Sequence, residues 1–405
     1  MLKSIRIRLY PDNEQKIYMN KLLGSSRFVY NNCLSYKIDQ YNNHKKSVSY
    51  PEMGKYLTNL KKIEKYSWLK DNHSKVLQQS LINLDIAYKN FFINGNGFPK
   101  FKSKHNKQSC RFPIDAIGKI KGNRINIILK LKNIHFKCSV QDERYLNKNQ
   151  DLIKSGTLNK TKSGKYYFSI LIDKPNKKIN NPKNEIIGID VGIKDFVIDS
   201  NGYRYENIKI KRNNQKKLNK LHKELSKKQK NSNNREKSKI KLSKFYEKLN
   251  NKKEYYLHSV INQLLRENQT IVIENLNVKE MMKNKNLSKS IQELSLNEFK
   301  EILKYKSKWY DRNLIEIDRW FPSSKLCNIC GFKNKELSLK DRKWICPECK
   351  TNHDRDINAA INIKNEGKRI FNIKENKIGL NSPKFTPLEN NLYSELGTKC
   401  KISKI

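Results

Sequence analysis

The sequence contains no apolar run near the roughly 18–20 residues that a membrane-spanning helix needs. The first ten residues place Lys3, Arg6 and Arg8 between apolar residues, whereas a signal peptide groups its charges ahead of an unbroken apolar stretch. We therefore expect a cytoplasmic protein with no membrane partner. Without a secretory signal, the eight cysteines do not predict a disulfide framework.

Acidic residues are also scarce. The chain of 405 residues has 39 Asp and Glu against 85 Lys and Arg, which gives a formal net charge of +46. A compact monomer with this excess repels itself, so a polyanionic partner is expected. Compositional drift in an AT-rich genome is the alternative, but drift would raise Asn and Ile without fixing the net charge. The charge balance therefore indicates nucleic-acid binding.

The first half of the chain predicts strands interrupted by helices. Residues 3–10 alternate between apolar and polar, which is typical of a strand, and Pro11 and Asp12 then open a helix. Helical patterning continues to about residue 92, and a β pattern occupies residues 111–173, with its clearest strands at 125–131 and 166–172. This order favours a β-barrel with an inserted helical lobe. The polar, Pro- and Asn-rich residues 174–184 predict a domain boundary.

The second half opens with an apolar strand at residues 186–190, followed by an antiparallel strand and a hairpin turn at 200–203. Residues 204–254 then carry nineteen Lys and Arg against five Asp and Glu. Two leucine stripes in this segment predict a helical hairpin with a basic exterior, which is either a solvated face or a surface that tracks phosphates. A second buried strand at 271–274, a helix at 296–309 and a strand at 314–317 follow.

Four cysteines form two pairs with metal-ligand spacing. Cys327 and Cys330 are separated by two residues, as are Cys346 and Cys349, and fifteen residues lie between the pairs. Each pair can grip one edge of a tetrahedral zinc ion from a tight turn. The spacing predicts one structural Zn²⁺, and a closed four-thiolate site leaves no open position for catalysis.

Three carboxylates form the second constellation. Asp190 and Glu274 each end an apolar strand, and Asp356 opens a helix after the paired cysteines. Hard oxygen ligands suit Mg²⁺, and two such ions can clamp both the attacking and the leaving oxygen of a phosphodiester. Acids from adjacent central strands and one helix terminus can converge on such a pair of ions, which is the arrangement of an RNase H-like fold.

Residues 188–194, 273–276 and 353–360 resemble the three RuvC motifs of the TnpB (OrfB) family, and the paired cysteines lie between the second and third motifs, as in that family. Residues 321–327 resemble its lead-in to the zinc ribbon. Further similar segments are residues 27–31, 87–92 and 97–101, so the resemblance runs from about residue 3 to 365.

The resemblance implies an α+β multidomain nuclease. It implies a wedge-like β-barrel with an inserted helical recognition lobe, then an RNase H-like (RuvC) α/β domain with an inserted zinc ribbon. The corresponding ranges are 1–20 and 100–180 for the wedge, 21–99 for the lobe, 181–320 and 351–367 for the RuvC domain, and 321–350 for the ribbon. We expect residues 368–405 to form a flexible C-terminal tail.

The resemblance also implies an activity. Proteins of this family bind a guide RNA from the transposon end and cut matching double-stranded DNA beside a short motif. It assigns Asp190, Glu274 and Asp356 as catalytic Mg²⁺ ligands, and the Asp-x-Asn-Ala-Ala pattern favours Asp356 over Asp354 as the third ligand. His353 is interpreted as structural. We expect a prokaryotic protein that works as a monomer on its RNA and associates with the nucleoid when bound to DNA.

Further residues are candidates for nucleic-acid contacts. Tyr50 can stack or bind phosphate, and Gln78 and Gln79 can pair with adenine beside Lys75, although all four suit an ordinary helix surface. Lys194 and Arg355 can contact the scissile strand or form surface ion pairs. Two aromatic side chains, Phe98 and Phe101, can stack bases beside neighbouring lysines, but a place in the core is favoured.

Four other functions remain open on the sequence. The first is an RNA-guided repressor without cleavage, which the presence of all three acids disfavours. The second is a small CRISPR effector, which the protein sequence hardly separates from the family above. The third is a transposase that moves DNA itself, for which no Tyr or Ser nucleophile motif is seen. The fourth is a non-catalytic zinc-ribbon RNA-binding protein, against which the three RuvC-like segments argue.

Overall fold

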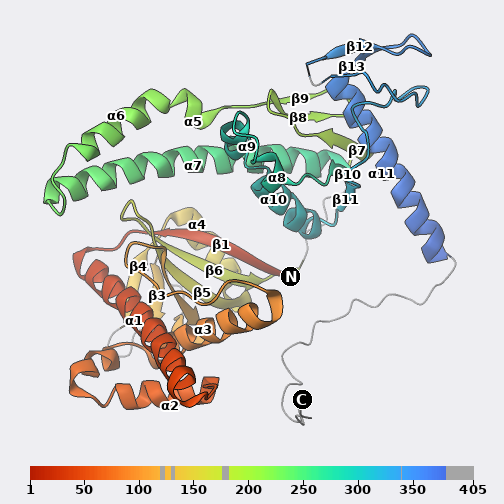
Figure 1. Cartoon of the computed structure of the whole chain (residues 1–405). Coiled ribbons are helices and arrows are strands. Elements are labelled where there is room, and N and C mark those ends of the chain that lie inside the picture. Colours follow the sequence, from red (N-terminus) through yellow and green to blue (C-terminus); the bar gives the residue numbers. More distant parts are fainter. Residues whose placement is uncertain (119–123, 129–132, 176–181, 339, 380–405) are drawn as a thin grey trace. The chain divides into compact units, whose positions relative to one another are not determined.

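The computed structural model describes residues 1–118, 124–128, 133–175, 182–338 and 340–379 (Figure 1). The chain divides into two compact units. The first unit contains residues 1–178, 209–259 and 308–311, and the second contains residues 179–208, 260–307 and 312–405. Each unit combines a sheet with helices, so the fold is α+β, as the sequence predicts. None of the helices in these described ranges is long and apolar enough to cross a membrane.

The main sheet of the first unit is antiparallel, with strand order β1-β6-β5-β2. Its strands are β1 (Leu2–Leu9), β2 (Gln108–Pro113), β5 (Ile153–Lys160) and β6 (Tyr166–Asp173). A separate hairpin consists of β3 (Arg124–Ile128) and β4 (Asn133–Lys137), while residues 129–131 of the predicted strand lie outside the described residues. As far as the strands are described, the sheet is open and the expected closed barrel is not seen. The alternation of apolar and polar residues predicts that one face of a sheet is buried, but it does not predict whether the sheet closes.

Three long helices build most of the remaining first unit. They are α1 (Asn13–His44), α2 (Tyr50–Leu60) and α3 (Ser74–Asn94). The predicted start at Pro11 and Asp12 is confirmed, because the Asp12 side chain accepts from the Gln15 backbone in a capping box. The first turns of α1 pack on the sheet through buried residues such as Leu22 and Leu23. Its later turns pack against α2 and α3, so a second, all-helical core separates from the sheet core.

The predicted basic helical hairpin is confirmed within the first unit. It follows the short helix α5 (Ile210–Asn213) and consists of α6 (Gln215–Ser226) and α7 (Asn233–Glu267), the last turns of which belong to the second unit. Four buried leucines form its seam, namely Leu218, Leu221, Leu242 and Leu249. The apolar stripes of the two helices therefore pack against each other, and the lysines face outward.

The sheet of the second unit has the order β11-β10-β7-β8-β9. Its strands are β7 (Asn184–Asp190), β8 (Asp195–Asp199), β9 (Arg204–Glu206), β10 (Asn268–Glu274) and β11 (Asn313–Ile317). The three apolar strands β7, β10 and β11 run parallel, while β8 and β9 are antiparallel and joined by the predicted turn. Parallel strands bring their carboxyl ends to one edge of the sheet, and the candidate acids Asp190 and Glu274 lie at this edge.

Helices cover this sheet and fix its edge. They are α8 (Val278–Met281), α9 (Ser288–Leu294), α10 (Leu296–Trp309) and α11 (Arg355–Gly379). α11 lies directly on β7, because a Cβ at Gly188 would sit 2.2 Å from the Ala360 carbonyl oxygen and 2.4 Å from the Lys364 nitrogen. Only glycine permits this backbone approach. The helix continues past residue 368, where a tail was expected, and residues 380–405 lie outside the described residues.

Candidate active site

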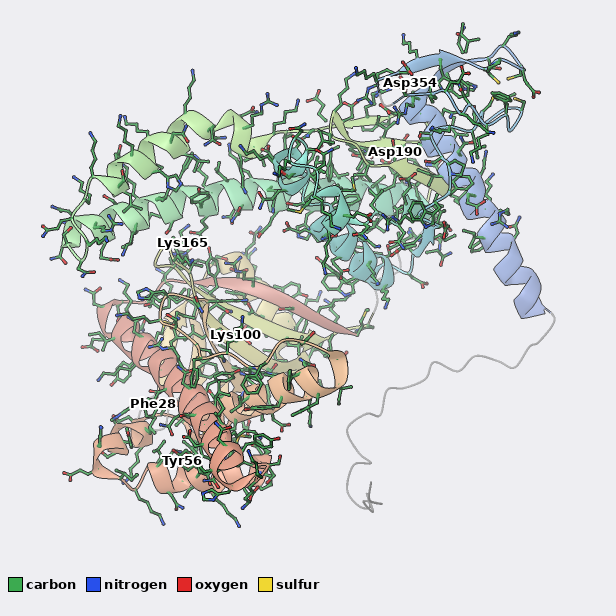
Figure 2. The ribbon with its side chains drawn as sticks, viewed as in Figure 1. Phe28, Tyr56, Lys100, Lys165, Asp190 and Asp354 are labelled. Atoms are coloured by element: carbon green, nitrogen blue, oxygen red, sulfur yellow. The ribbon has the colours of Figure 1, made fainter. Side chains whose placement is uncertain are left out.

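Asp190 ends β7 at the carboxyl edge of the second unit's sheet (Figure 2), and Glu274 ends the neighbouring strand β10. β7 and β10 pair in parallel with Ile189 opposite Ile273, so the next residue of each strand is a carboxylate at the same level. Neighbouring strands are about 4.8 Å apart, and residues in register point to the same face. The apolar runs before the two acids are buried, and this burial fixes the register that brings the acids together.

Negative charge accumulates at this edge. Burial, then the Glu274 and Asp356 carboxylates, raise the pKa of Asp190 to about 7. Burial also raises the pKa of Glu274, against the effect of a hydrogen bond that the Ser323 hydroxyl donates to its Oε1. The structure thus brings the three predicted acids within electrostatic reach of one another.

Asp356 enters from the first turn of α11 and is held by two neighbours. Asp354 caps the helix, because its Oδ1 accepts hydrogen bonds at 3.1 Å from the Asp356 and Ile357 nitrogens. Arg204 in turn binds Asp354 at 2.8 Å, which ties the cap to the sheet. The Asp356 carboxylate itself receives Arg342 Nη1, 3.2 and 3.1 Å from its two oxygens. Asp354 therefore supports the helix terminus, and Asp356 offers its carboxylate to the site.

The four predicted cysteines converge on one point. In the described part of the chain they are the one group of three or more potential ligands whose ligand atoms all lie within 4.8 Å of one another. The Cys327 and Cys349 sulfurs are 3.5 Å apart, and those of Cys330 and Cys346 are 3.6 Å apart. A tetrahedral site with Zn–S bonds of about 2.3 Å requires sulfur separations of roughly 3.8 Å, so the donor set suits Zn²⁺.

The ribbon that carries these cysteines is bound tightly to α11. Its strands β12 (Lys343–Ile345) and β13 (Asn352–Asp354) pair, and β13 runs directly into the helix. From the helix, the Asn358 and Asn362 side chains both donate to the Leu326 carbonyl at 2.7 Å. His353 Nε2 lies 3.1 Å from the Cys327 sulfur, which agrees with the structural role interpreted for it. The ribbon and the third carboxylate thus share one scaffold.

The carboxylate set suits a hard divalent cation. Carboxylate oxygens are the ligands that Mg²⁺ prefers, and burial first, then the charges of Glu274 and Asp356, raise the pKa of Asp190. Among the described residues, the three acids are spaced more widely than the cysteine ligands.

A basic groove of about 1250 Å³ lies within the first unit, lined by β-strand and loop residues and by the α6–α7 hairpin. Its cationic lining residues are Arg6, Arg27, Lys104, Lys107, Lys160, Lys162 and Lys239. Arg6 lies over the Tyr167 ring at 3.9 Å, Arg27 donates to the Gln108 amide at 2.5 Å, and Lys160 donates to the Asn20 amide at 2.8 Å. These three partners are neutral, so they orient the three cations without cancelling their charge, whereas Lys239 pairs with Glu236 at 2.5 Å.

The other predicted contact residues are divided between the units. Tyr50 begins α2, and Lys75, Gln78 and Gln79 lie in the first two turns of α3, where Lys75 pairs with Asp115. In the second unit, Lys194 is exposed four residues after Asp190, and Arg355 donates to the Ser338 carbonyl at 3.0 Å and lowers the pKa of Asp190.

The prediction that Phe98 and Phe101 belong to the core is wrong. Phe98 is 46% exposed and Phe101 is 55% exposed. Phe98 packs edge-on against Tyr88 and Phe91, at 5.6 and 5.4 Å between ring centroids, and these rings form a partly solvated aromatic group. Local aromatic composition does not reveal burial, which depends on where the loop after α3 lies.

Sequence reasoning missed three residues of the site. Ser323, which binds Glu274, lies inside the segment that leads into the ribbon, so its place in that motif was an available signal. Arg342 and Arg204 carry no such signal, because their contacts to Asp356 and Asp354 arise only when the ribbon and the sheet edge fold.

Comparison with known proteins gives three family matches. Residues 169–285 match a family described as "Probable transposase", residues 297–363 match "Cas12f1-like, TNB domain", and residues 1–46 match "Helix-turn-helix domain". In this structure the last range forms β1 and the single long helix α1 rather than two helices joined by a turn.

Relatives extend over nearly the whole chain. A Streptomyces pristinaespiralis protein named "Putative RNA-guided DNA endonuclease" is 33% identical over 362 residues, which are 89% of this chain and 88% of the relative. InsQ of Escherichia coli K12, with the same description, is 29% identical over 387 residues, 91% of this chain and 93% of InsQ.

Solved structures show the same fold. The complex of Cas12f1 with sgRNA and target DNA aligns with a TM-score of 0.57 at 15% identity, covering 90% of this chain and 98% of Cas12f1. The mini-RNA-guided endonuclease CRISPR-Cas_phi3 also aligns with a TM-score of 0.57, at 10% identity, covering 91% and 92% of the two chains.

Proposed function

Because the chain belongs to the TnpB (OrfB) family, we propose that it is a transposon-encoded RNA-guided DNA endonuclease. It binds a guide RNA from the transposon end and cleaves complementary double-stranded DNA beside a short target-adjacent motif. The observation that carries the proposal is the meeting of Asp190, Glu274 and Asp356 at one sheet edge, where burial and then the other two carboxylates raise the pKa of Asp190.

In this proposal the three acids are the catalytic residues and the Mg²⁺ ligands. These carboxylates would hold a pair of Mg²⁺ ions, which would supply Lewis-acid activation of a water and charge stabilisation of the leaving 3′ oxygen. The hydroxyl of Ser323 orients Glu274, and the Asp354 cap fixes the helix turn that presents Asp356. Lys194 and Arg355 add positive charge where the scissile strand would lie.

The finer domain assignment is part of the same proposal. In the second unit, three parallel strands flanked by an antiparallel pair support an RNase H-like RuvC domain at 181–320 and 351–367, with the ribbon at 321–350 holding one Zn²⁺. In the first unit we assign the sheet to a wedge at 1–20 and 100–180, and the all-helical core to a recognition lobe at 21–99.

We assign the basic groove of the first unit to the guide RNA. A ring holds Arg6 and two amides hold Arg27 and Lys160, so an RNA phosphate would meet three charges that are already oriented. Tyr50, Lys75, Gln78 and Gln79 are the residues we propose to read the target-adjacent motif. The protein would act as a monomer on its RNA in a prokaryotic cytoplasm, where sequence choice comes mainly from base pairing.

A cleavage assay tests the activity. The chain is co-expressed with its native flanking DNA, the bound RNA is sequenced, and the complex is incubated with a plasmid library that has a matching target and randomised flanks. We expect Mg²⁺-dependent cutting beside one enriched flank. Asp190→Ala should abolish the cut. Glu316→Gln should preserve it, because Glu316 is a carboxylate of the same sheet whose charge is matched by Lys300 at 2.7 Å.

The outcomes separate the alternatives. RNA-dependent binding without cutting would identify a guided repressor instead of a nuclease. Purified protein that carries no RNA would overturn the guided function and favour a zinc-ribbon protein that acts without a guide, or a transposase. A repeat array beside the gene, rather than a transposon end, would place the chain among CRISPR effectors.

An RNA-binding assay tests the groove separately. Replacing Arg6, Arg27 and Lys160 with glutamine removes three groove charges, so the slope of log affinity against log salt should fall by about 2. A triple replacement of the exposed Lys283, Lys285 and Lys289 removes the same charge elsewhere and is the matched control. Equal slopes for the two triple variants would refute the assignment of the groove.

A further inference from the structure

Arg342 is a zinc-ribbon residue that grips a carboxylate of the candidate active site. Its Nη1 approaches both oxygens of Asp356, at 3.2 and 3.1 Å. The Asp356 side chain is 17% exposed, whereas that of Arg342 is 52% exposed. Asp356 is therefore mostly buried in the site, while the Arg342 side chain reaches it from solvent.

The backbone of Arg342 is held while its side chain has room to move. The Arg342 carbonyl accepts a hydrogen bond at 2.8 Å from the Arg355 nitrogen. The next residue, Lys343, pairs with Asp354 in the β12–β13 ladder. Rotation of the exposed side chain can thus break the contact with Asp356 without disturbing the ribbon or the start of α11.

We propose that Arg342 competes with the active-site metal for the Asp356 carboxylate, so that the ribbon weakens metal binding until the arginine is drawn away. The inference rests on the proposed function, in which Asp356 is a metal ligand. A carboxylate oxygen that accepts from a guanidinium has fewer lone pairs for a cation, and the positive charge repels that cation. Arg342 is a positioning residue in this scheme.

A nucleic-acid strand is the natural competitor for the arginine. Guanidinium groups bind phosphate in the same forked geometry as carboxylate, and a phosphodiester on the ribbon would offer Arg342 a second anion. Its release would free Asp356 at the moment when the substrate arrives. The metal site would then reach full affinity only when a strand is present, which limits cutting without a target.

Metal binding measured without cleavage tests this competition. Mn²⁺ is titrated into the zinc-loaded full chain without nucleic acid, and the free ion is followed by electron paramagnetic resonance. Since partly exposed ion pairs contribute little, Arg342→Gln should bind Mn²⁺ roughly two- to fivefold more tightly than the unaltered chain. Arg342→Lys, which keeps the charge but loses the planar fork, should lie between them.

The matched control is Lys343→Gln, which removes the same charge from the exposed residue that follows Arg342 in the chain. Equal Mn²⁺ affinity for Arg342→Gln and Lys343→Gln would overturn the competition, because the effect would then be general electrostatics. Zinc content confirms that the ribbon is intact. If Arg342→Gln loses zinc, Arg342→Lys decides the question, and an affinity for Mn²⁺ no higher than that of the unaltered chain refutes it.

A second readout adds a single-stranded DNA oligonucleotide. It should tighten Mn²⁺ binding by the unaltered chain but not by Arg342→Gln, whose Asp356 is already free. Equal tightening in both proteins would contradict the release of Arg342 by a strand. Failure of the proposed function looks different. In that case Asp190→Ala would bind Mn²⁺ with the same affinity as the unaltered chain.

Discussion

Replacing Asp190 with asparagine is expected to stabilise the metal-free protein above neutral pH. The pKa of Asp190 is about 7 in the folded chain, against an ordinary value of 3.8. This difference of about three pH units, at about 1.36 kcal/mol per unit, corresponds to roughly 4 kcal/mol. Asparagine keeps the shape of a protonated aspartic acid and never ionises, so it avoids that cost.

The pH range of the effect follows from the sign of the shift. Between about pH 4 and pH 7 the folded protein holds a proton on Asp190 that the unfolded chain has lost, so stability falls as the pH rises through this window. Below pH 4 both states are protonated, and above about pH 8 both are ionised. The benefit of Asp190→Asn should therefore be near zero at pH 4 and reach a plateau of roughly 4 kcal/mol at pH 8.

Urea unfolding of the zinc-loaded, Mg²⁺-free protein at pH 4, 6 and 8 measures this profile. Adding Mg²⁺ at pH 8 should then stabilise the unaltered chain, because the ion binds only the folded state, and should stabilise the variant much less. Parallel pH profiles for the two proteins would refute the reasoning, since they would mean that Asp190 titrates normally and that no excess charge gathers at the sheet edge.

Three further changes test other parts of the structure. Gly188→Ala forces a Cβ against the Ala360 backbone and should cost about 3 kcal/mol in urea unfolding; a cost below about 1 kcal/mol would contradict this close approach. Cys346→Ser should abolish stoichiometric zinc, measured by elemental analysis, and zinc retained at one per chain would refute a four-thiolate site. Burial alone would raise the pKa of Glu247, but hydrogen bonds from Ser163 and Tyr167 and its pairing with Lys165 hold that pKa below its usual value. Glu247→Gln should therefore lower the free energy of unfolding by roughly 1–3 kcal/mol at pH 7, and by progressively less as the pH falls below about 4.5. Equal losses at pH 3 and pH 7 would count against this role of Glu247.

The sheet of the second unit could be predicted closely from the sequence. The apolar runs at 186–190 and 271–274 are short, uninterrupted and end in an acid, and this pattern predicts the two buried strands that the structure shows in parallel pairing. The helix predicted at 296–309 coincides with α10. These elements are governed by local hydrophobic pattern, which the sequence displays directly.

Features that depend on distant partners could not be predicted. Closure of the first sheet depends on pairing between strands far apart in the chain, and the expected barrel is not seen in the ranges that the structure describes. The exposure of Phe98 and the contact of Arg342 with Asp356 are set by the path of loops, for which the residues themselves give no rule. The acids were predictable as a group, but the cations that hold them were not.

The shared scaffold of ribbon and helix has a consequence for the cell that makes this protein. The strand that closes the cysteine site passes without a break into the turn that presents Asp356. If the four cysteines hold zinc and Asp356 is a metal ligand, as proposed above, a chain made without zinc would lack a firm position for Asp356, whatever the supply of magnesium. The zinc supply of the host would then decide what fraction of newly made molecules can cut DNA, and therefore how much active nuclease the cell contains.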